Sequence, residues 1–290
     1  MTPSPRSVSR VAPAKLNVFL RVLGAREDGY HELESLVLPL SLADLVTVTE
    51  ADKLDVVVDA QVDLSMGLDA GGMNLALMAA LALAEASGGL MRGAEIRITK
   101  RIPVAAGLGG GSADAAATLL ALNELWGGGL DLDSLRSIGE QIGSDVPAML
   151  AGGPVMMRGR GERIVAVHAL TTWWAVKPFD FPTRSPDAYR WWDEDVGSTG
   201  PDPGVLIAAA ETGNVDLLGH ALFNDLEEPV ASRHPEIAAA KHAFLEAGAL
   251  GAMMSGSGPT VVALARHMGQ ADRLTQAVPG SFVVSGPPAG

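Results

Sequence analysis

Cysteine is absent from the 290 residues, and this absence excludes several kinds of chemistry. The chain can form no disulfide, has no thiol nucleophile and offers no thiolate to a zinc ion. Its six histidines show no H-E-x-x-H or similar metal-ligand spacing. We therefore expect no metal site built by the protein alone, and the lack of cysteine suits a cytoplasmic protein.

Basic residues and long apolar runs are also scarce. Lysine and arginine total 21 against 34 aspartates and glutamates, a net charge of −13, so we expect no nucleic-acid partner. The most apolar helical segment, residues 75–86, is shorter than the roughly 18 residues that suggest a membrane span. Residues 1–10 lack the apolar core of a signal peptide. We expect no membrane partner, and the sequence does not indicate an oligomeric state.

Glycine, by contrast, is concentrated in residues 103–113, where four glycines occupy five consecutive positions. Each glycine would cost about 1 kcal/mol in a helix interior relative to alanine, so this stretch predicts a loop. The apolar segment that follows, residues 115–126, predicts a helix. Because the first N–H groups of a helix have no partner within it, a glycine loop at a helix start predicts an anion site, here for a phosphate chain.

Two familiar phosphate loops do not fit this stretch. A Walker A loop needs a lysine after its last glycine, and the dinucleotide fingerprint needs a glycine where Ser112 stands. A plain flexible loop is the alternative on local evidence. An acidic chain that binds phosphate must gather its few cations near the site. The candidates are Lys15, Arg21, Arg26, Lys100 and Arg101.

Three other segments could contribute to the same site. Lys15 lies alone in an apolar stretch, Asp145 lies at a turn before Pro147, and residues 255–259 form a second loop of small residues. Each has an ordinary reading, as a surface lysine or as a turn. Their meaning therefore depends on whether they occur together.

Local patterns predict a mixture of strands and helices. The expected strands are residues 18–23, 36–40, 45–48, 54–58, 94–99, 171–176 and 260–265, with a hairpin formed by 154–157 and 165–167. The expected helices are residues 75–86, 112–126, 133–142, 205–211, 215–223 and 235–247. Residues 179–204 are rich in proline and aspartate and predict a long connection.

Taken together, these segments resemble the GHMP kinase superfamily. Its three signatures are an N-terminal Pro-x-Lys segment, a P-x-x-x-G-L-G-x-G-S-A loop and a C-terminal loop of small residues, and all three occur here in order. The resemblance implies a two-domain α+β fold. Residues 1–157 would form an ATP-binding domain with a left-handed βαβ unit, and residues 158–290 a C-terminal α/β sandwich domain. ATP with Mg²⁺ would be the phosphoryl donor.

One branch of the superfamily fits better than the others, and Asp28-Gly29-Tyr30-His31 separates it from them. Residues 13–17, 26–33, 107–113, 143–147 and 224–227 also match that branch. The resemblance implies transfer of the γ-phosphoryl group of ATP to the 2-hydroxyl of 4-diphosphocytidyl-2-C-methyl-D-erythritol, in the non-mevalonate route to isoprenoid precursors. The alternatives are a mevalonate- or homoserine-kinase-like enzyme of the superfamily, and a nucleotide-binding protein without turnover.

The resemblance also implies roles for single residues. Lys15 and Asp145 fall on the catalytic positions, where Asp145 would accept the hydroxyl proton or orient the hydroxyl. Substrate contacts fall on Asn17, Tyr30, His31 and Tyr189, with Trp191 and Trp192 as alternatives to Tyr189.

ATP contacts would come from the glycine loop and two outlying residues: Pro103, Val104, Ala105, Ala106, Gly107, Leu108, Gly109, Gly110, Gly111, Ser112, Ala113, Asn74 and Lys100. The C-terminal loop would contribute Gly256, Ser257 and Gly258. Asp114 departs from the pattern, because it adds a carboxylate near the phosphates. Either a magnesium ion or a side chain that turns away would relieve the repulsion.

Overall fold

The computed structural model describes residues 5–62, 74–88, 92–195 and 200–288. Contacts divide the chain into two units. The first contains residues 1–14, 42–104 and 109–152, and the second contains residues 15–41, 105–108 and 153–290. Two long strands, β1 (Ser7–Ala25) and β2 (His31–Glu50), contribute residues to both units. The units therefore interleave along the chain, and a single domain boundary after residue 157 stays a prediction.

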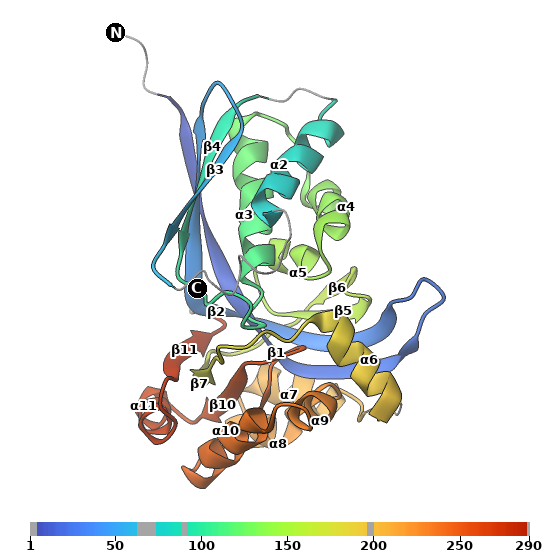
Figure 1. Ribbon diagram of the computed structural model, residues 1–290, viewed down its shortest axis with the longest axis vertical. Coiled ribbons are helices and arrows are strands. Elements are labelled where there is room, and N and C mark those ends of the chain that lie inside the picture. Colours follow the sequence, from blue (N-terminus) through green and yellow to red (C-terminus); the bar gives the residue numbers. More distant parts are fainter. Residues whose placement is uncertain (1–4, 63–73, 89–91, 196–199, 289–290) are drawn as a thin grey trace. The chain divides into compact units, whose positions relative to one another are not determined.

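The first unit is a sheet covered by helices. Its strands follow the order β3–β4–β2–β1, with β3 at Asp55–Ala60 and β4 at Ala94–Lys100. β3 and β4 are parallel and are joined through α2 (Leu75–Ala86), which makes a βαβ unit. The other helices are α3 (Gly110–Leu125), α4 (Leu132–Ile142) and α5 (Val146–Leu150). Figure 1 shows these four helices on the same side of the strands.

The core of the first unit follows from the sequence periods. Alternate residues of β4, including Ile96 and Ile98, are buried, as the period of two in residues 94–99 predicts. The residues that α2 and α3 bury in this core are largely alanine and leucine. Asn74 caps α2, since its side chain accepts a hydrogen bond from the backbone N–H of Ala76. The predicted helix 75–86 is confirmed.

The second unit contains short strands beside β1 and β2 and a separate sheet. β5 (Val155–Gly159) pairs with β2 and with β6 (Arg163–Ala166), and β8 (Phe223–Asn224) pairs with β1. The separate sheet has the order β11–β7–β10–β9, formed by Phe282–Gly286, Thr172–Lys177, Val261–Ala265 and Gly251–Met254. Its helices are α6 (Ser185–Asp195), α7 (Gly204–Thr212), α8 (Val215–Ala221), α9 (Glu227–Ala231), α10 (Pro235–Glu246) and α11 (Met268–Ala277). Its buried core includes Phe244, Ile237 and Val261.

Several expectations were wrong. Residues 36–40 and 45–48 are parts of one strand, β2, and the expected connection 179–204 contains α6. Gly110 and Gly111, expected in a loop, begin α3, and the helix expected over 215–223 ends at Ala221, with Phe223 in β8. A proline is compatible with the first turn of a helix, so Pro186 does not prevent α6. Ala188 and Trp192, four residues apart, bury one face of that helix. None of the helices in the described ranges is long and apolar enough to cross a membrane.

Candidate active site

The second half of the glycine loop forms the start of α3 in the first unit. Gly109 precedes the helix with a φ of 71°, in the left-handed region that favours glycine. No side chain caps this helix start, and Gly111 is exposed. The N–H groups of the first turn are therefore presented to a ligand, as the sequence predicts for an anion site.

Residues 105–108 of the same loop belong to the second unit, where two other predicted segments hold them. The backbone N–H of Lys15 donates to the carbonyl oxygen of Leu108 over 2.9 Å. The Thr260 hydroxyl donates to the carbonyl oxygen of Ala106 over 2.5 Å. A Cβ at Gly107 would lie 2.4 Å from the carbonyl oxygen of Gly258, so only glycine fits there. Within the second unit, the structure thus brings residues 105–108 of the glycine loop, the Lys15 segment and the C-terminal small-residue loop together.

Lys15 and Asn17 form a buried polar chain in the second unit. The Lys15 ammonium donates to Asn17 Oδ1 over 2.6 Å, and Asn17 Nδ2 donates to the Ser35 hydroxyl over 2.8 Å. The Ser35 hydroxyl in turn donates to the carbonyl oxygen of Phe19 over 2.7 Å. A Cβ at Gly256 would lie 3.3 Å from the Lys15 ammonium nitrogen. These contacts fix the orientation of both predicted site residues, and they contradict the reading of Lys15 as a surface lysine.

Side chains of the segment 224–227 form hydrogen bonds with the backbone at the start of the C-terminal loop. Asn224 Nδ2 donates to the carbonyl oxygens of Met254 and Gly256, both over 2.8 Å. The Glu227 carboxylate accepts from the backbone N–H of Met254 over 2.7 Å, and Lys241 forms an ion pair with Glu227. The matching of this segment to the kinase branch therefore has a structural reason, because the side chains of Asn224 and Glu227 hold the loop that faces Lys15 and Asn17.

Asp145 lies in the first unit, at the position that precedes α5. Its side chain makes no capping hydrogen bond to that helix, so helix capping does not explain the carboxylate. The predicted pairing of Asp145 with Lys15 stays a prediction.

Lys100 and Asp114 form a buried cluster with Asp44. The Lys100 ammonium donates to Asp44 over 2.5 Å and to Asp114 over 2.6 Å. The ammonium thus offsets the extra carboxylate of Asp114, whose other oxygen, Oδ1, is buried with no hydrogen-bond partner in the structure. The predicted contacts of Lys100 and Asn74 with the adenosine of ATP stay predictions.

This cluster predicts a pH dependence of stability. Burial raises the pKa of the Asp114 carboxyl to about 7, although the Lys100 ammonium opposes the shift; the Asp44 carboxylate adds to it. The folded chain therefore binds this proton more tightly than the unfolded chain, so the free energy of unfolding falls as pH rises from about 4 to about 7. Asp114→Asn should remove roughly 1–4 kcal/mol of that decline, measured by urea unfolding at about pH 5 and about pH 8. If the free energy of unfolding declined equally in wild type and in Asp114→Asn, the result would contradict this prediction.

The turn that contains Tyr30 has its own supports in the second unit. The Asp28 carboxylate accepts from the backbone N–H of Tyr30 over 3.1 Å, which lowers the pKa of Asp28. Gly29 has a φ of 82°, and Arg26 N–H donates to the Tyr30 carbonyl oxygen over 2.7 Å. Tyr30 is 50% exposed, with the Arg160 guanidinium carbon 5.1 Å from its ring centre. The turn therefore holds an aromatic ring at the surface.

His31 contacts two of the other candidate aromatic residues, Tyr189 and Trp192. Its ring stacks on Tyr189 with centres 4.8 Å apart and planes 20° apart, and its Nε2 lies 2.9 Å from the Asp193 carboxylate. Trp192 meets His31 edge-on at 6.0 Å and is 3% exposed, whereas Trp191 packs under the guanidinium of Arg233. The geometry favours Tyr189 over both tryptophans as the partner of His31. At 4.8 Å no third ring fits between them, so a base would stack on another face.

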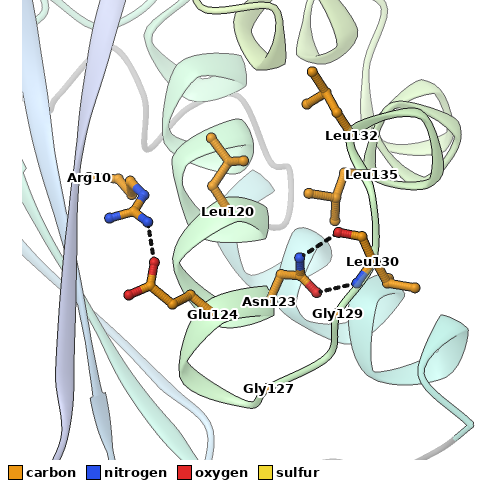
Figure 2. A pocket seen from close by; sticks show the side chains of 9 residues that line it. All are labelled: Arg10, Leu120, Asn123, Glu124, Gly127, Gly129, Leu130, Leu132 and Leu135. Atoms are coloured by element: carbon orange, nitrogen blue, oxygen red, sulfur yellow. Dashed lines mark hydrogen bonds and ion pairs between the residues drawn. The ribbon is translucent and has the colours of Figure 1, made fainter.

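A separate pocket of about 460 Å³ lies at the far end of α3 from the glycine loop. Figure 2 shows leucine side chains and an ion pair between Arg10 and Glu124 around it. Asn123 is engaged there by two hydrogen bonds to Leu130. Because α3 has 16 residues, it is about 24 Å long, and this pocket is not the phosphate site.

Three residues of these clusters were not predicted from the sequence: Ser35, Asp44 and Asp193. Each lies far along the chain from its partner, and each is of a type that is common in turns and on surfaces. The only available signal was Asp44, the single charged residue in the stretch 36–48.

One substitution tests the loop directly. Gly109→Val should weaken ATP binding about tenfold or more, because a β-branched residue does not tolerate a φ of 71° and the start of α3 must shift. Affinity for a nucleotide analogue, measured by calorimetry, should fall more than affinity for the second substrate. Equal loss of both would indicate general misfolding, and unchanged ATP affinity would place the phosphates elsewhere.

Comparison with known proteins first defines the class. The family profile described as GHMP kinases N terminal domain matches residues 74–153, and the profile described as GHMP kinases C terminal matches residues 206–284. A solved homoserine kinase from Cytophaga hutchinsonii shares the fold, with a TM-score of 0.72 at 23% identity over 99% of this chain and 96% of that one. The fold is that of a GHMP kinase, and the profiles of both GHMP kinase domains match the chain.

Closer relatives narrow the class. A curated relative from Symbiobacterium thermophilum, named 4-diphosphocytidyl-2-C-methyl-D-erythritol kinase, is 43% identical over 268 residues, which are 91% of this chain and 93% of the relative. A crystal structure of 4-(cytidine 5'-diphospho)-2C-methyl-D-erythritol kinase has a TM-score of 0.80 at 33% identity, covering 97% of this chain and all of the other. The chain belongs to the family of 4-diphosphocytidyl-2-C-methyl-D-erythritol kinases.

Proposed function

We propose that this chain transfers the γ-phosphoryl group of ATP to the 2-hydroxyl of 4-diphosphocytidyl-2-C-methyl-D-erythritol, in the cytoplasm, as a step toward isoprenoid precursors. The observation that carries the proposal is the assembly around Lys15. The glycine loop, the C-terminal loop and Asn17 all contact the Lys15 segment or its neighbours. Family membership supplies the substrate that this assembly serves.

Lys15 and Asp145 are the proposed catalytic residues. The Asp145 carboxylate accepts the proton of the substrate hydroxyl or orients that hydroxyl toward the γ-phosphorus. The Lys15 ammonium, oriented by Asn17, offsets negative charge on the phosphoryl group as it moves. Phosphoryl transfer passes through a loose transition state, so positioning and charge stabilisation contribute most of the rate.

Mg²⁺ enters this proposal with the nucleotide. Among the described residues, no group of three or more histidine and carboxylate side chains could hold a metal ion. Mg²⁺ commonly binds through substrate phosphates with only one or two protein groups. A site without a larger cluster of carboxylates therefore fits an ion carried by ATP. When bound, it would neutralise phosphate charge.

The cytidine half of the substrate is assigned to the Tyr30 turn and the His31–Tyr189 pair. The exposed ring of Tyr30 offers a stacking face, and His31 offers a ring nitrogen to the edge of the base. ATP binding does not require either residue. Their presence favours a kinase that selects its acceptor through a second nucleotide.

A single assay separates this proposal from its alternatives. ATP consumption by the purified chain is measured with 4-diphosphocytidyl-2-C-methyl-D-erythritol, mevalonate and homoserine in parallel. We expect turnover with the cytidine substrate alone. Preference for mevalonate or homoserine would assign another GHMP kinase activity, and nucleotide binding without turnover of any acceptor would indicate a non-catalytic protein.

A further inference from the structure

Asp44 lies at the junction between β4 and the glycine loop. Its side chain is fully buried and accepts three hydrogen bonds. The donors are the Lys100 ammonium at 2.5 Å and the backbone N–H groups of Arg101 at 2.5 Å and Ile102 at 2.8 Å. These donors belong to consecutive residues, and Pro103, the first residue of the loop, follows directly. One carboxylate therefore fixes the path of the chain as it enters the loop.

The same cluster reaches the end of the loop. The Lys100 ammonium, held by Asp44, also donates to Asp114 in the first turns of α3. A Cβ at Gly110, the first residue of α3, would lie 3.0 Å from the Lys100 ammonium nitrogen and 3.1 Å from the side chain of Ile102. The helix start therefore packs directly on the group that Asp44 holds.

Stability alone does not account for this arrangement. The cluster buries two carboxylates against one ammonium, and the cost of removing such groups from water commonly equals or exceeds their mutual attraction. Well-packed apolar side chains would stabilise the unit as well. They could not, however, accept hydrogen bonds from the two backbone N–H groups that begin the loop.

We propose that Asp44 is a positioning residue for nucleotide binding. It fixes residues 101–102 directly and the start of α3 through Lys100, so the N–H groups of that helix start are oriented before the nucleotide arrives. Preorganised donors gain affinity because little rearrangement accompanies binding. This inference rests on the proposed function for the identity of the loop's ligand, ATP.

Asp44→Asn is the test. The amide oxygen can still accept from one set of donors, but the amide N–H₂ group then faces the Lys100 ammonium or a backbone N–H. We expect the Kd for a non-hydrolysable ATP analogue and the KM for ATP to rise about tenfold, while kcat and the KM for the cytidine substrate stay within about twofold. That split marks a defect in nucleotide positioning.

Asp225→Asn is the matched control. Asp225 is another buried carboxylate, and it accepts from the backbone N–H groups of Val22 at 2.7 Å and Gly200 at 3.3 Å in the second unit. The same chemical change there should lower the melting temperature without altering the Kd for the analogue. Equal Kd values for Asp44→Asn and wild type would overturn the proposal, as would equal losses for both substrates.

Two further outcomes keep the test decisive. If Asp44→Asn does not fold, hydrogen exchange on the wild-type chain replaces it: the amides of Arg101 and Ile102 should be protected without nucleotide, and exchange at the rate of free peptide would overturn the proposal. If the wild type binds the analogue but does not phosphorylate the cytidine substrate, the proposed function fails. The comparison of Kd values then still decides the role of Asp44.

Discussion

Asp145→Asn is expected to lower kcat about 100- to 10,000-fold, the usual range for loss of a general base or an orienting carboxylate. An amide is nearly isosteric with the carboxylate, but it cannot accept the proton of the hydroxyl. The change should leave folding intact, because Asp145 is only half-buried and the amide has nearly the size of the carboxylate. Steady-state kinetics with ATP and the cytidine substrate measure the effect, and KM values for both should change little.

The control for this prediction is Asp133→Asn. Asp133 belongs to the same unit and lies in the first turn of α4, but its side chain is 88% exposed and pairs with Arg136 on the surface. The Asp133→Asn variant should retain wild-type kcat. If Asp145→Asn keeps more than about half of the wild-type kcat, Asp145 has no part in proton transfer and the mechanism must change.

The elements that the sequence predicts well are those with a clear period or a clear cap. Residues 75–86 and the alternating strand 94–99 are confirmed closely. The prediction divided β2 between residues 40 and 45, where Ser41 and Asp44 interrupt the apolar run. In the structure the strand continues through this stretch, with residues 33–37 paired to β5 and residues 45–50 paired to β4.

The candidate site likewise contains residues that the sequence could assign and residues that it could not. Motifs that are continuous in sequence, such as the glycine loop and the Tyr30 turn, could be assigned from their residues. Asp44 could not, because it meets its donors 56 to 58 residues further along the chain. Asp193 meets His31 across 162 residues, and it belongs to a helix that the proline-rich composition of residues 179–204 concealed. Such pairs depend on topology, which a single sequence does not specify.

The His31–Asp193 pair leads to the second large expected effect, the discrimination between cytosine and uracil. A carboxylate only accepts, so the contact with Asp193 places a proton on His31 Nε2. In the neutral ring, Nδ1 is then an acceptor. Such a nitrogen suits the exocyclic amino group of cytosine and repels the carbonyl oxygen that uracil has at that position.

Wild-type chain should therefore prefer the cytidine substrate over its uridine analogue by about 10- to 100-fold in kcat/KM, because an unpaired polar group at a binding site costs about 1–3 kcal/mol. His31→Ala should reduce the ratio to near unity. Asp193→Asn should reduce it partly, because an amide can donate as well as accept and no longer fixes the tautomer. Asp187→Asn on the same helix, where Asp187 forms an ion pair with Arg190, should keep the wild-type ratio. If wild type uses both analogues equally well, or if Asp193→Asn retains the full ratio, the tautomer of His31 does not select the base.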